Sequence, residues 1–237
     1  MKIIIQLLFL FIFLDGFSQE TVKHLKPLVG GVPDLSAHAQ KAFQRRDNLL
    51  EIQTRTPTQE RELDSLLNDY SEAQTNVWDI IDGGCSWYCG GGPYKVTASS
   101  ELDTNYRAEY AHDLSFKSVW AEGKKGDGAG EYLTYYFENT SPRINKIIIY
   151  NGYSKTEDLW KENSRVKALK LYVNDKLFAI LELEDKRNEQ SFSIPLLGRR
   201  SDGKELILKF EIADIYPGTK YSDTVITELF FDGIDVH

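Results

Sequence analysis

Few residues of this chain are grouped in a way that would support catalysis. Among the four histidines, His112 falls in a predicted loop next to Asp113, with no serine or cysteine matched to it as a nucleophile. A catalytic triad is therefore not predicted. A glycosidase needs two carboxylates instead, and four acidic residues are candidates: Glu122, Glu131, Asp223 and Glu228. Acidic residues are common in a chain of net charge -8, so we expect these four to solvate the surface or cap turns, and we predict that the protein is not an enzyme.

A second group of residues suits ligand binding. Aromatic rings are easily desolvated against the apolar face of a sugar, while Asn, Arg and Asp side chains hold its hydroxyl groups. Two alternatives remain open, namely that Tyr153 covers the core of its own loop, and that Arg165 and Asp223 form an ion pair between two loops. Six residues of these types lie in or next to predicted loops, where a β-sandwich presents its binding site: Tyr153, Trp160, Asn163, Arg165, Tyr221 and Asp223.

Strands must hold these loops, and the chain from Gly83 onward predicts them. Apolar and polar residues alternate there in short runs separated by Gly, Asn, Asp and Pro, which is typical of antiparallel strands with one buried face. In the clearest run, Leu206, Leu208 and Phe210 occupy alternate positions. About eight such runs favour a mainly β fold, an antiparallel β-sandwich or jelly roll. The runs are 94–99, 131–138, 145–150, 169–173, 177–183, 190–195, 206–212 and 225–232.

Two helices are predicted before the strands. The first covers residues 36–52. The second has a clear start, because Thr56 is followed by Pro57 at the first helical position and Gln59 at the third, the outline of a capping box. We expect an antiparallel helical hairpin, which is either a structural appendage or a spacer or docking arm for a partner. The apolar positions of the second helix recur at helical spacing: Leu63, Leu66, Leu67, Tyr70, Ala73 and Val77.

Short motifs in the strand region follow a characteristic order. Ala98-Ser99-Ser100 precedes Asp113, and Ser118 stands two residues before Trp120. This order resembles the opening of discoidin-like domains of the coagulation-factor type C kind, whose fold is a galactose-binding-like sandwich. The resemblance implies a non-catalytic module that binds carbohydrate. Further motifs are similar to the subgroup named for NAD-glycohydrolase translocation, or NADase-type glycan binding: 85–92, 120–123, 151–153, 163–167 and 221–224.

The resemblance also implies a structural calcium ion. In related carbohydrate-binding sandwiches such an ion joins the first loop to the last strand, and calcium takes about six to eight oxygen ligands in flexible geometry. Here Asp113, Ser118 and Glu228 would supply side-chain oxygens. The chain departs from the usual loop pattern because no glycine follows Asp113. The alternative is that Asp113 caps a turn and Glu228 pairs with Arg165 or Lys167.

Cys85 and Cys89 are the two cysteines of the chain. Two thiolates without a nearby histidine do not make a zinc site, which normally needs about four ligands. In an exported protein the two can keep a disulfide, and so short a ring would add about 2 kcal/mol of stability. We expect the bridge to stiffen a turn that presents Trp87 and Tyr88. The alternative is a structural clip with both aromatic rings packed into the core.

The first residues of the chain have the layout of a secretory signal peptide. Lys2 precedes an apolar run at 3–14, and the small residues Gly16 and Ser18 follow. The run is too short for a permanent transmembrane anchor. We therefore predict a signal peptide over 1–18 that is cleaved near Ser18, and export to the periplasm, the cell surface or the medium. A tail and helical hairpin would then occupy 19–77, and the discoidin-like sandwich 78–237.

The predicted function is an exported, non-catalytic module that binds a glycan through loops at the rim of a β-sandwich. Nucleic acid is not expected as a partner, because an acidic surface repels the phosphate backbone. Two other functions stay open. The hairpin and sandwich together would dock another exported protein during envelope assembly, or Glu122 and Glu228 would hydrolyse a glycan.

Overall fold

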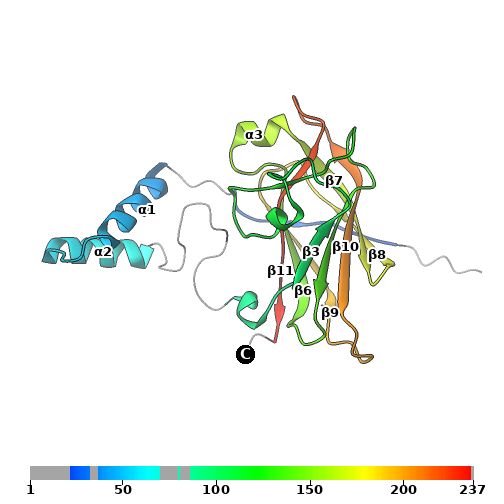
Figure 1. Cartoon of the computed structure of the whole chain (residues 1–237), viewed down its shortest axis with the longest axis horizontal. Coiled ribbons are helices and arrows are strands. Elements are labelled where there is room, and N and C mark those ends of the chain that lie inside the picture. The colour runs from blue at the N-terminus through cyan, green and yellow to red at the C-terminus, as the bar shows by residue number, and fades with distance from the viewer. Residues whose placement is uncertain (1–21, 33–36, 70–79, 81–85, 236–237) are drawn as a thin grey trace, which may run out of the picture.

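Two layers of β-strands form the larger part of the molecule, and a pair of helices precedes them (Figure 1). This computed structural model describes residues 22–32, 37–69, 80 and 86–235. The predicted signal peptide at 1–18 and the predicted disulfide partner Cys85 lie outside the described residues. Within the described residues, no helix is long and apolar enough to cross a membrane.

The strands follow one pairing path that folds into two layers. The path crosses between layers where β11 pairs with β7 in parallel over two residue pairs only, Thr224 with Ser164 and Val225 with Arg165. One layer contains β2 (Leu28–Val29), β9 (Glu189–Leu197), β6 (Arg143–Asn151), β11 (Thr224–Ile234) and β4 (Trp120–Ala121). The other contains β1 (Lys23–Leu25), β8 (Lys176–Glu182), β7 (Ser164–Val173), β10 (Leu206–Tyr216), β5 (Tyr132–Phe137) and β3 (Lys95–Ala98).

A hydrophobic core fills the space between the two layers, so the predicted β-sandwich is confirmed. Along β10 the residues at 206, 208, 210 and 212 are buried, while those between them are partly exposed. Phe231 of β11 lies at the centre of the core, with its ring centre 5.1 Å from those of both Tyr135 and Phe137. Strand β11 is buried on both faces from Thr224 to Phe231, because loops also cover its outer side.

The short 3₁₀ helix η1 (Trp87–Gly90) contributes to this core. Trp87 is buried, and its indole nitrogen donates a hydrogen bond to the Arg143 carbonyl. The Tyr88 hydroxyl accepts a hydrogen bond from the backbone nitrogen of Phe231 at 2.9 Å. Both aromatic rings are thus packed into the core and are not presented to a ligand. Cys89, between them and the next loop, is exposed.

The helices α1 (Ala37–Leu50) and α2 (Pro57–Asp69) form the predicted hairpin. The capping box is present, since Gln59 accepts a hydrogen bond from the Thr56 backbone nitrogen and donates its own backbone N–H to the Thr56 hydroxyl. Arg45 binds Glu62 through two hydrogen bonds of 2.8 Å that join the helices. The expected extension of the second helix to Val77 falls on residues outside the described ranges.

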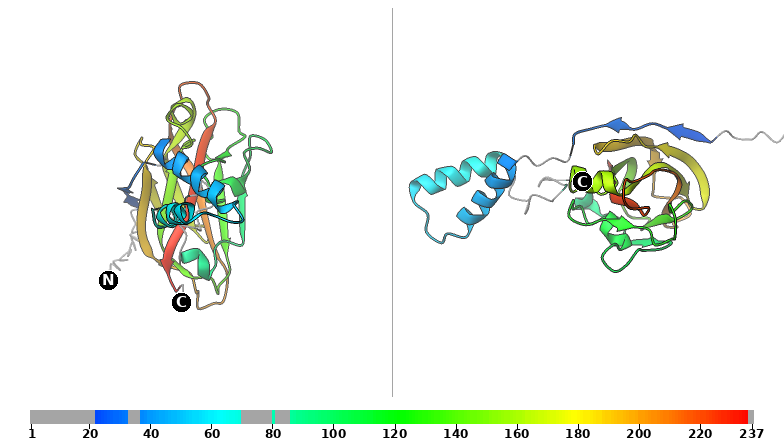
Figure 2. Two further views of the ribbon diagram at one scale, coloured as in Figure 1. Left: turned by 90° about the vertical axis from the view of Figure 1, so that its left-hand side faces the viewer. Right: turned by 90° about the horizontal axis from the view of Figure 1, so that it is seen from above.

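A short N-terminal strap, residues 22–30, lies along the edges of both layers and was not predicted. Its strand β1 pairs in parallel with β8, and its strand β2 pairs antiparallel with β9. Figure 2 shows the strap running along one side of the ring of strands. The strap therefore covers two sheet edges that would otherwise expose unpaired backbone groups.

Candidate functional site

The candidate site lies at the end of the sandwich where β6 leaves the sheet. Asn151 is buried there and bonds to both backbone groups of Val166, donating to its carbonyl and accepting from its N–H. Gly152 follows with a φ of 74°, and a Cβ atom on it would lie 2.6 Å from Arg165. This position requires glycine, because the left-handed backbone and the close neighbour exclude a side chain. The turn directs the next residue, Tyr153, to the rim.

Helix α3 (Glu157–Glu162) and the loop after β10 form the opposite wall of the site. Thr156 caps the helix by accepting a hydrogen bond from the Leu159 backbone nitrogen. The backbone nitrogen of Tyr221 donates to the Glu162 carbonyl at 2.9 Å. A Cβ atom on Gly218 would lie 2.5 Å from the same carbonyl oxygen, so only glycine permits this approach. Helix and loop are therefore held together before any ligand arrives.

Between these walls is a pocket of about 310 Å³, which we call the rim pocket. Four of the six predicted ligand-binding residues line it, Tyr153, Asn163, Tyr221 and Asp223. Sequence reasoning missed five further lining residues: Leu102, Tyr106, Ala121, Leu159 and Val225. Leu102 and Tyr221 are 42% and 41% exposed, so apolar surface is open to solvent at the pocket mouth.

The floor of the rim pocket is apolar and aromatic. Tyr106 and Tyr153 pack against the buried cluster that contains Ala121 and Val225. The Tyr153 hydroxyl donates a long hydrogen bond of 3.4 Å to the Lys117 carbonyl. Burial, with a smaller contribution from Tyr106, raises the pKa of Tyr153, so its hydroxyl remains protonated at neutral pH. Tyr153 therefore covers the core of its loop and lines the pocket at the same time, which combines the two alternatives.

The polar groups of the rim pocket differ in how far they are already engaged. The Asn163 amide nitrogen donates to the Leu159 carbonyl at 2.8 Å. The Asp223 carboxylate has no hydrogen bond or ion pair to another residue that the structure describes. One face of the Tyr221 ring is covered by the Lys220 ammonium, 4.8 Å from the ring centre. Asp223 is therefore an acceptor in this pocket that is available to a ligand.

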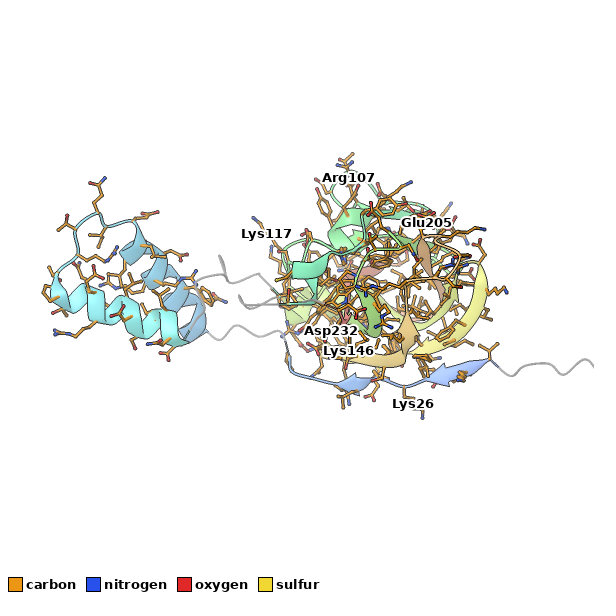
Figure 3. All side chains as sticks on the ribbon, turned by 90° about the horizontal axis from the view of Figure 1, so that it is seen from below. Lys26, Arg107, Lys117, Lys146, Glu205 and Asp232 are labelled. Carbon is orange, nitrogen blue, oxygen red and sulfur yellow. The ribbon has the colours of Figure 1, made fainter. Side chains whose placement is uncertain are left out.

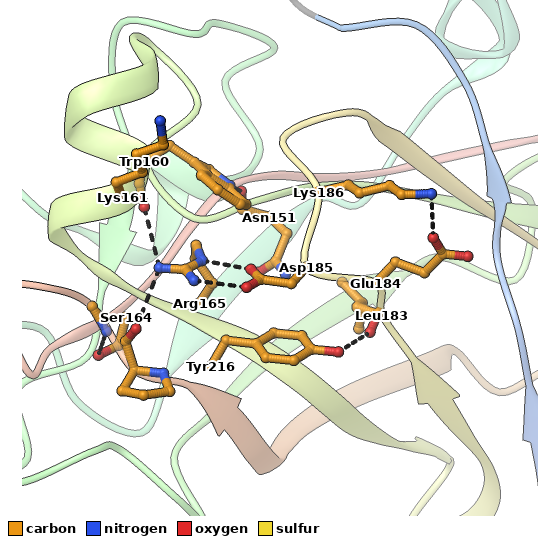
Figure 4. Close-up of polar contacts among 12 residues, drawn as sticks. Asn151, Trp160, Lys161, Ser164, Arg165, Leu183, Glu184, Asp185, Lys186 and Tyr216 are labelled. Carbon is orange, nitrogen blue, oxygen red and sulfur yellow. Dashed lines mark hydrogen bonds and ion pairs between the residues drawn. The ribbon is translucent and has the colours of Figure 1, made fainter.

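Trp160 and Arg165, the other two predicted ligand-binding residues, are buried beneath the rim (Figure 4). The Arg165 guanidinium stacks 4.4 Å from the centre of the Trp160 ring and binds Asp185 through two hydrogen bonds of 2.9 and 3.0 Å. It also donates to the Asn163 carbonyl. The expected ion pair of Arg165 is therefore made with Asp185 and not with Asp223. With its donors engaged and 6% exposure, Arg165 holds the loops in place and does not line the pocket.

The three predicted metal ligands, Asp113, Ser118 and Glu228, come together beside the middle of β11. The Ser118 hydroxyl donates to one Asp113 oxygen, and the Ser115 backbone nitrogen lies 3.1 Å from both the other Asp113 oxygen and Glu228 Oε1. Glu228 is fully buried, and its Oε2 has no hydrogen-bond partner. Burial and the adjacent Asp113 raise the pKa of Glu228 well above its usual range. Glu228 thus does not pair with Arg165 or Lys167.

Two adjacent carboxylates and an unpartnered buried oxygen suit a cation, because calcium prefers such oxygen ligands. A group of three or more His, Cys, Asp or Glu side chains placed for a metal ion is absent from the described residues. Asp113, Glu228 and the Ser118 hydroxyl fit calcium in donor type, and the remaining oxygens would have to come from the backbone.

The residues considered for catalysis are engaged in hydrogen bonds and packing contacts within the protein. Glu122 is fully buried and accepts hydrogen bonds from the backbone nitrogens of Lys124 and Thr224, which ties its loop to β11. Glu131 accepts from the hydroxyls of Ser99 and Ser100. His112 packs among aromatic rings, its Nδ1 lies 3.0 Å from the Leu229 carbonyl, and burial lowers its pKa. These side chains stabilise loops, and none of the three lines the rim pocket.

Two solved structures are similar to this chain at low sequence identity. The chain is similar to chitosan-binding module 1 of a chitosanase/glucanase from Paenibacillus sp. IK-5, with 12% identity, a TM-score of 0.35, and 61% of this chain and 98% of that chain covered. It is also similar to the CBM32-1 and CBM32-2 domains of Clostridium perfringens ZmpB, with 12% identity, a TM-score of 0.45, and coverage of 84% and 51%. Among curated proteins, none matches the chain.

The family comparison is more specific. The model of the family described as NAD glycohydrolase translocation F5/8 type C domain matches residues 87–232, which is more than half of the chain. The matched span begins at η1 and ends within β11, so it contains both layers of the sandwich apart from the N-terminal strap. The predicted resemblance is confirmed, and the chain belongs to the NAD glycohydrolase translocation F5/8 type C domain family.

Proposed function

We propose that this protein is a non-catalytic binding module that holds a glycan in the rim pocket. The observation that carries the proposal is the placement of an unengaged carboxylate, Asp223, beside the partly exposed ring of Tyr221 over a floor of Tyr106 and Tyr153. A sugar presents apolar C–H groups to aromatic rings and hydroxyl groups to carboxylates. The rim pocket offers both kinds of partner side by side.

The size and rigidity of the pocket support a small glycan unit. Its volume of about 310 Å³ lies at the lower end of the range for ligand pockets. The walls are connected by backbone hydrogen bonds between Tyr221 and Glu162 and by the Arg165 contacts beneath them. A preorganised site loses little conformational entropy on binding. We therefore propose recognition of one or two sugar units at a chain end or branch.

The burial of the candidate acids supports binding in place of hydrolysis. A glycosidase needs both carboxylates at the scissile bond, whereas Glu122 and Glu228 are 0% exposed and face loop backbone. Asp223 alone would supply an acidic group to the rim pocket. The proposed module therefore retains its ligand unchanged.

We further infer that calcium occupies the position beside Asp113 and Glu228. The ion would compensate the repulsion between two adjacent carboxylates, one of which is fully buried with an unpartnered oxygen. It would fasten the loop at Ser115 to β11 and so brace one end of the sandwich. Export is part of the same proposal, since a signal peptide and a calcium-braced sandwich both suit an extracellular setting, where calcium is abundant.

A glycan array tests the proposal. The full mature chain is expected to bind a subset of glycans, and Tyr221→Ala and Asp223→Asn are each expected to reduce binding at least tenfold. Matched controls are Tyr94→Ala, an exposed tyrosine directly before β3, and Asp175→Asn, in a hairpin turn, neither of which lines the rim pocket. Wild-type protein that binds no glycan, or binding that survives both rim substitutions, would contradict the proposal.

A further inference from the structure

A second pocket lies on the outer face of the β8, β7 and β10 layer, away from the rim pocket, and we call it the strap pocket. Its volume is about 690 Å³, well within the usual range for small-molecule sites. The strands supply most of the lining, and the N-terminal strap closes one side with His24, Lys26 and Pro27. The family match begins after the strap, so this wall lies outside the residues that the family model matches.

The hollow results from small residues at positions where neighbouring strands meet. Ala168 of β7 is the register partner of both Asp214 on β10 and Glu182 on β8. Ala213 and Ile180 extend the apolar floor on either side. Larger side chains at 168 and 213 would fill this space. The floor therefore offers a flat apolar surface about as wide as three strands.

An ordered aromatic ring stands at the edge of this floor. Tyr216 donates its hydroxyl proton to the Leu183 carbonyl at 3.1 Å, which fixes the ring across the end of β8 (Figure 4). Lys167 lies 6.0 Å from the centre of the same ring. A fixed ring beside small apolar residues suits the C–H face of a sugar.

Each acidic side chain around the strap pocket already has a partner within the protein. Three of them pair with a Lys or Arg cation, and Glu182 shares a hydrogen bond with the His24 ring. His24 lies 2.7 Å from Glu182, and Lys167 2.6 Å from Asp214. The remaining two pairs bring in residues behind the wall, Lys186 with Glu184 at 2.6 Å and Arg165 with Asp185 at 2.9 Å. The pairing raises the pKa of Lys167 and lowers that of Asp214, so this pair stays charged at neutral pH.

This pairing of the acidic side chains favours one kind of ligand. A charged ligand would lose its hydration without finding a free countercharge on the walls. The remaining cation, Lys26, is exposed on the strap, where water solvates it (Figure 3). Paired carboxylates still keep lone pairs that accept hydrogen bonds from hydroxyl groups. The lining therefore favours an uncharged molecule that has many hydroxyl groups and one apolar face.

We propose that the strap pocket is a second binding site, which takes an uncharged sugar unit independently of the rim pocket. Its position on the face of a sheet would let one glycan chain, or two separate chains, engage the module at two places. Two weak sites on one rigid body raise the overall affinity for a multivalent glycan surface. The class of ligand agrees with the proposed function, but the strap pocket does not need the rim pocket to bind.

Amide chemical-shift mapping of the full mature chain separates the two sites. The probes are methyl glycosides of glucose, galactose, mannose and N-acetylglucosamine, together with their uncharged disaccharides. At least one probe is expected to shift amides of 24–27, 180–185 and 213–216. Ala168→Trp, which fills the floor, is expected to weaken these shifts at least tenfold in Kd and to leave shifts at 221–223 unchanged. Thr97→Trp, on the edge strand of the same layer and outside the pocket, is the matched control.

A second variant covers the case in which Ala168→Trp does not fold. Tyr216→Leu removes the ring and keeps an apolar side chain, and it is expected to raise the Kd at the strap pocket about tenfold. A probe that shifts only rim amides, or strap-pocket shifts that survive both variants, would overturn the second site and leave the rim proposal standing. Strap-pocket shifts without rim shifts would overturn the rim proposal and leave the second site standing. No shift with any probe would reject both.

Discussion

The Arg165 guanidinium lies 4.4 Å from the centre of the Trp160 ring, stacked beneath the rim of the sandwich. The same group binds Asp185 through a two-bond fork. One buried cation thus links α3, β7 and the loop after β8. The loops that line the rim pocket are positioned by this contact.

Arg165→Lys is therefore expected to destabilise the protein, although Arg165 does not line the rim pocket. Lysine keeps the charge but loses the planar fork and the stacking on Trp160. We expect a loss of about 1–3 kcal/mol in the free energy of unfolding, at the lower end because Asp185 is partly exposed. Urea unfolding measures it. Arg107→Lys, at an exposed loop position, is the control, and equal stability of the two variants would argue against the bracing role.

Gly152→Ala tests the turn that directs Tyr153 to the rim. The alanine Cβ atom would meet Arg165 at 2.6 Å and Trp160 at 2.8 Å in a left-handed backbone conformation. We expect a loss of about 2 kcal/mol or more in unfolding free energy, together with weaker glycan binding. Gly31→Ala has open space around its Cβ position and should change stability little. Thermal unfolding of both variants shows whether position 152, unlike position 31, requires glycine.

Glu131 should make stability depend on pH in the acid range. Burial raises the pKa of Glu131, but the hydrogen bonds that Ser100 and Ser99 donate to it lower the pKa by more. The net shift is therefore downward. A folded-state pKa below the unfolded value of about 4.3 gives stability that is present above that pH. This contribution disappears as pH falls through the lowered folded-state pKa.

The double variant Ser99→Ala, Ser100→Ala removes these donors. It should lose about 1 kcal/mol at pH 7 and show a shallower fall in stability below pH 4. Unfolding free energies measured between about pH 2 and pH 7 test this. An unchanged acid slope would mean that the Glu131 contacts do not stabilise the ionised form.

Calcium is expected to raise the melting temperature, and a chelator to lower it. At calcium concentrations about 100 times the Kd the gain would be about 2.7 kcal/mol. Asp113→Ala should abolish the response. Asp103→Ala is the control, because Asp103 accepts a similar backbone hydrogen bond two residues ahead, from Asn105, at a position away from Glu228. A melting temperature that ignores calcium in the wild type would remove the ion from the proposal.

The alternation along β10 and the capping box at Thr56 were readable from the sequence because each depends on residues that are close along the chain. The family resemblance was readable for a related reason, since its motifs occur in a set order. Sequence reasoning also placed Tyr153, Asn163, Tyr221 and Asp223 in loops. All four line one pocket in the folded chain.

The tertiary structure alone decided which loop side chains face outward. A strand's period of two assigns its side chains to faces, but a loop has no such period, and its side chains point where distant contacts allow. The Arg165 side chain points inward because Trp160 and Asp185, from other segments, stack on it and bind it. The strap could not be predicted from the sequence for the same reason. Its strands have three and two residues, and they form only because the edges of β8 and β9 are available to pair with them.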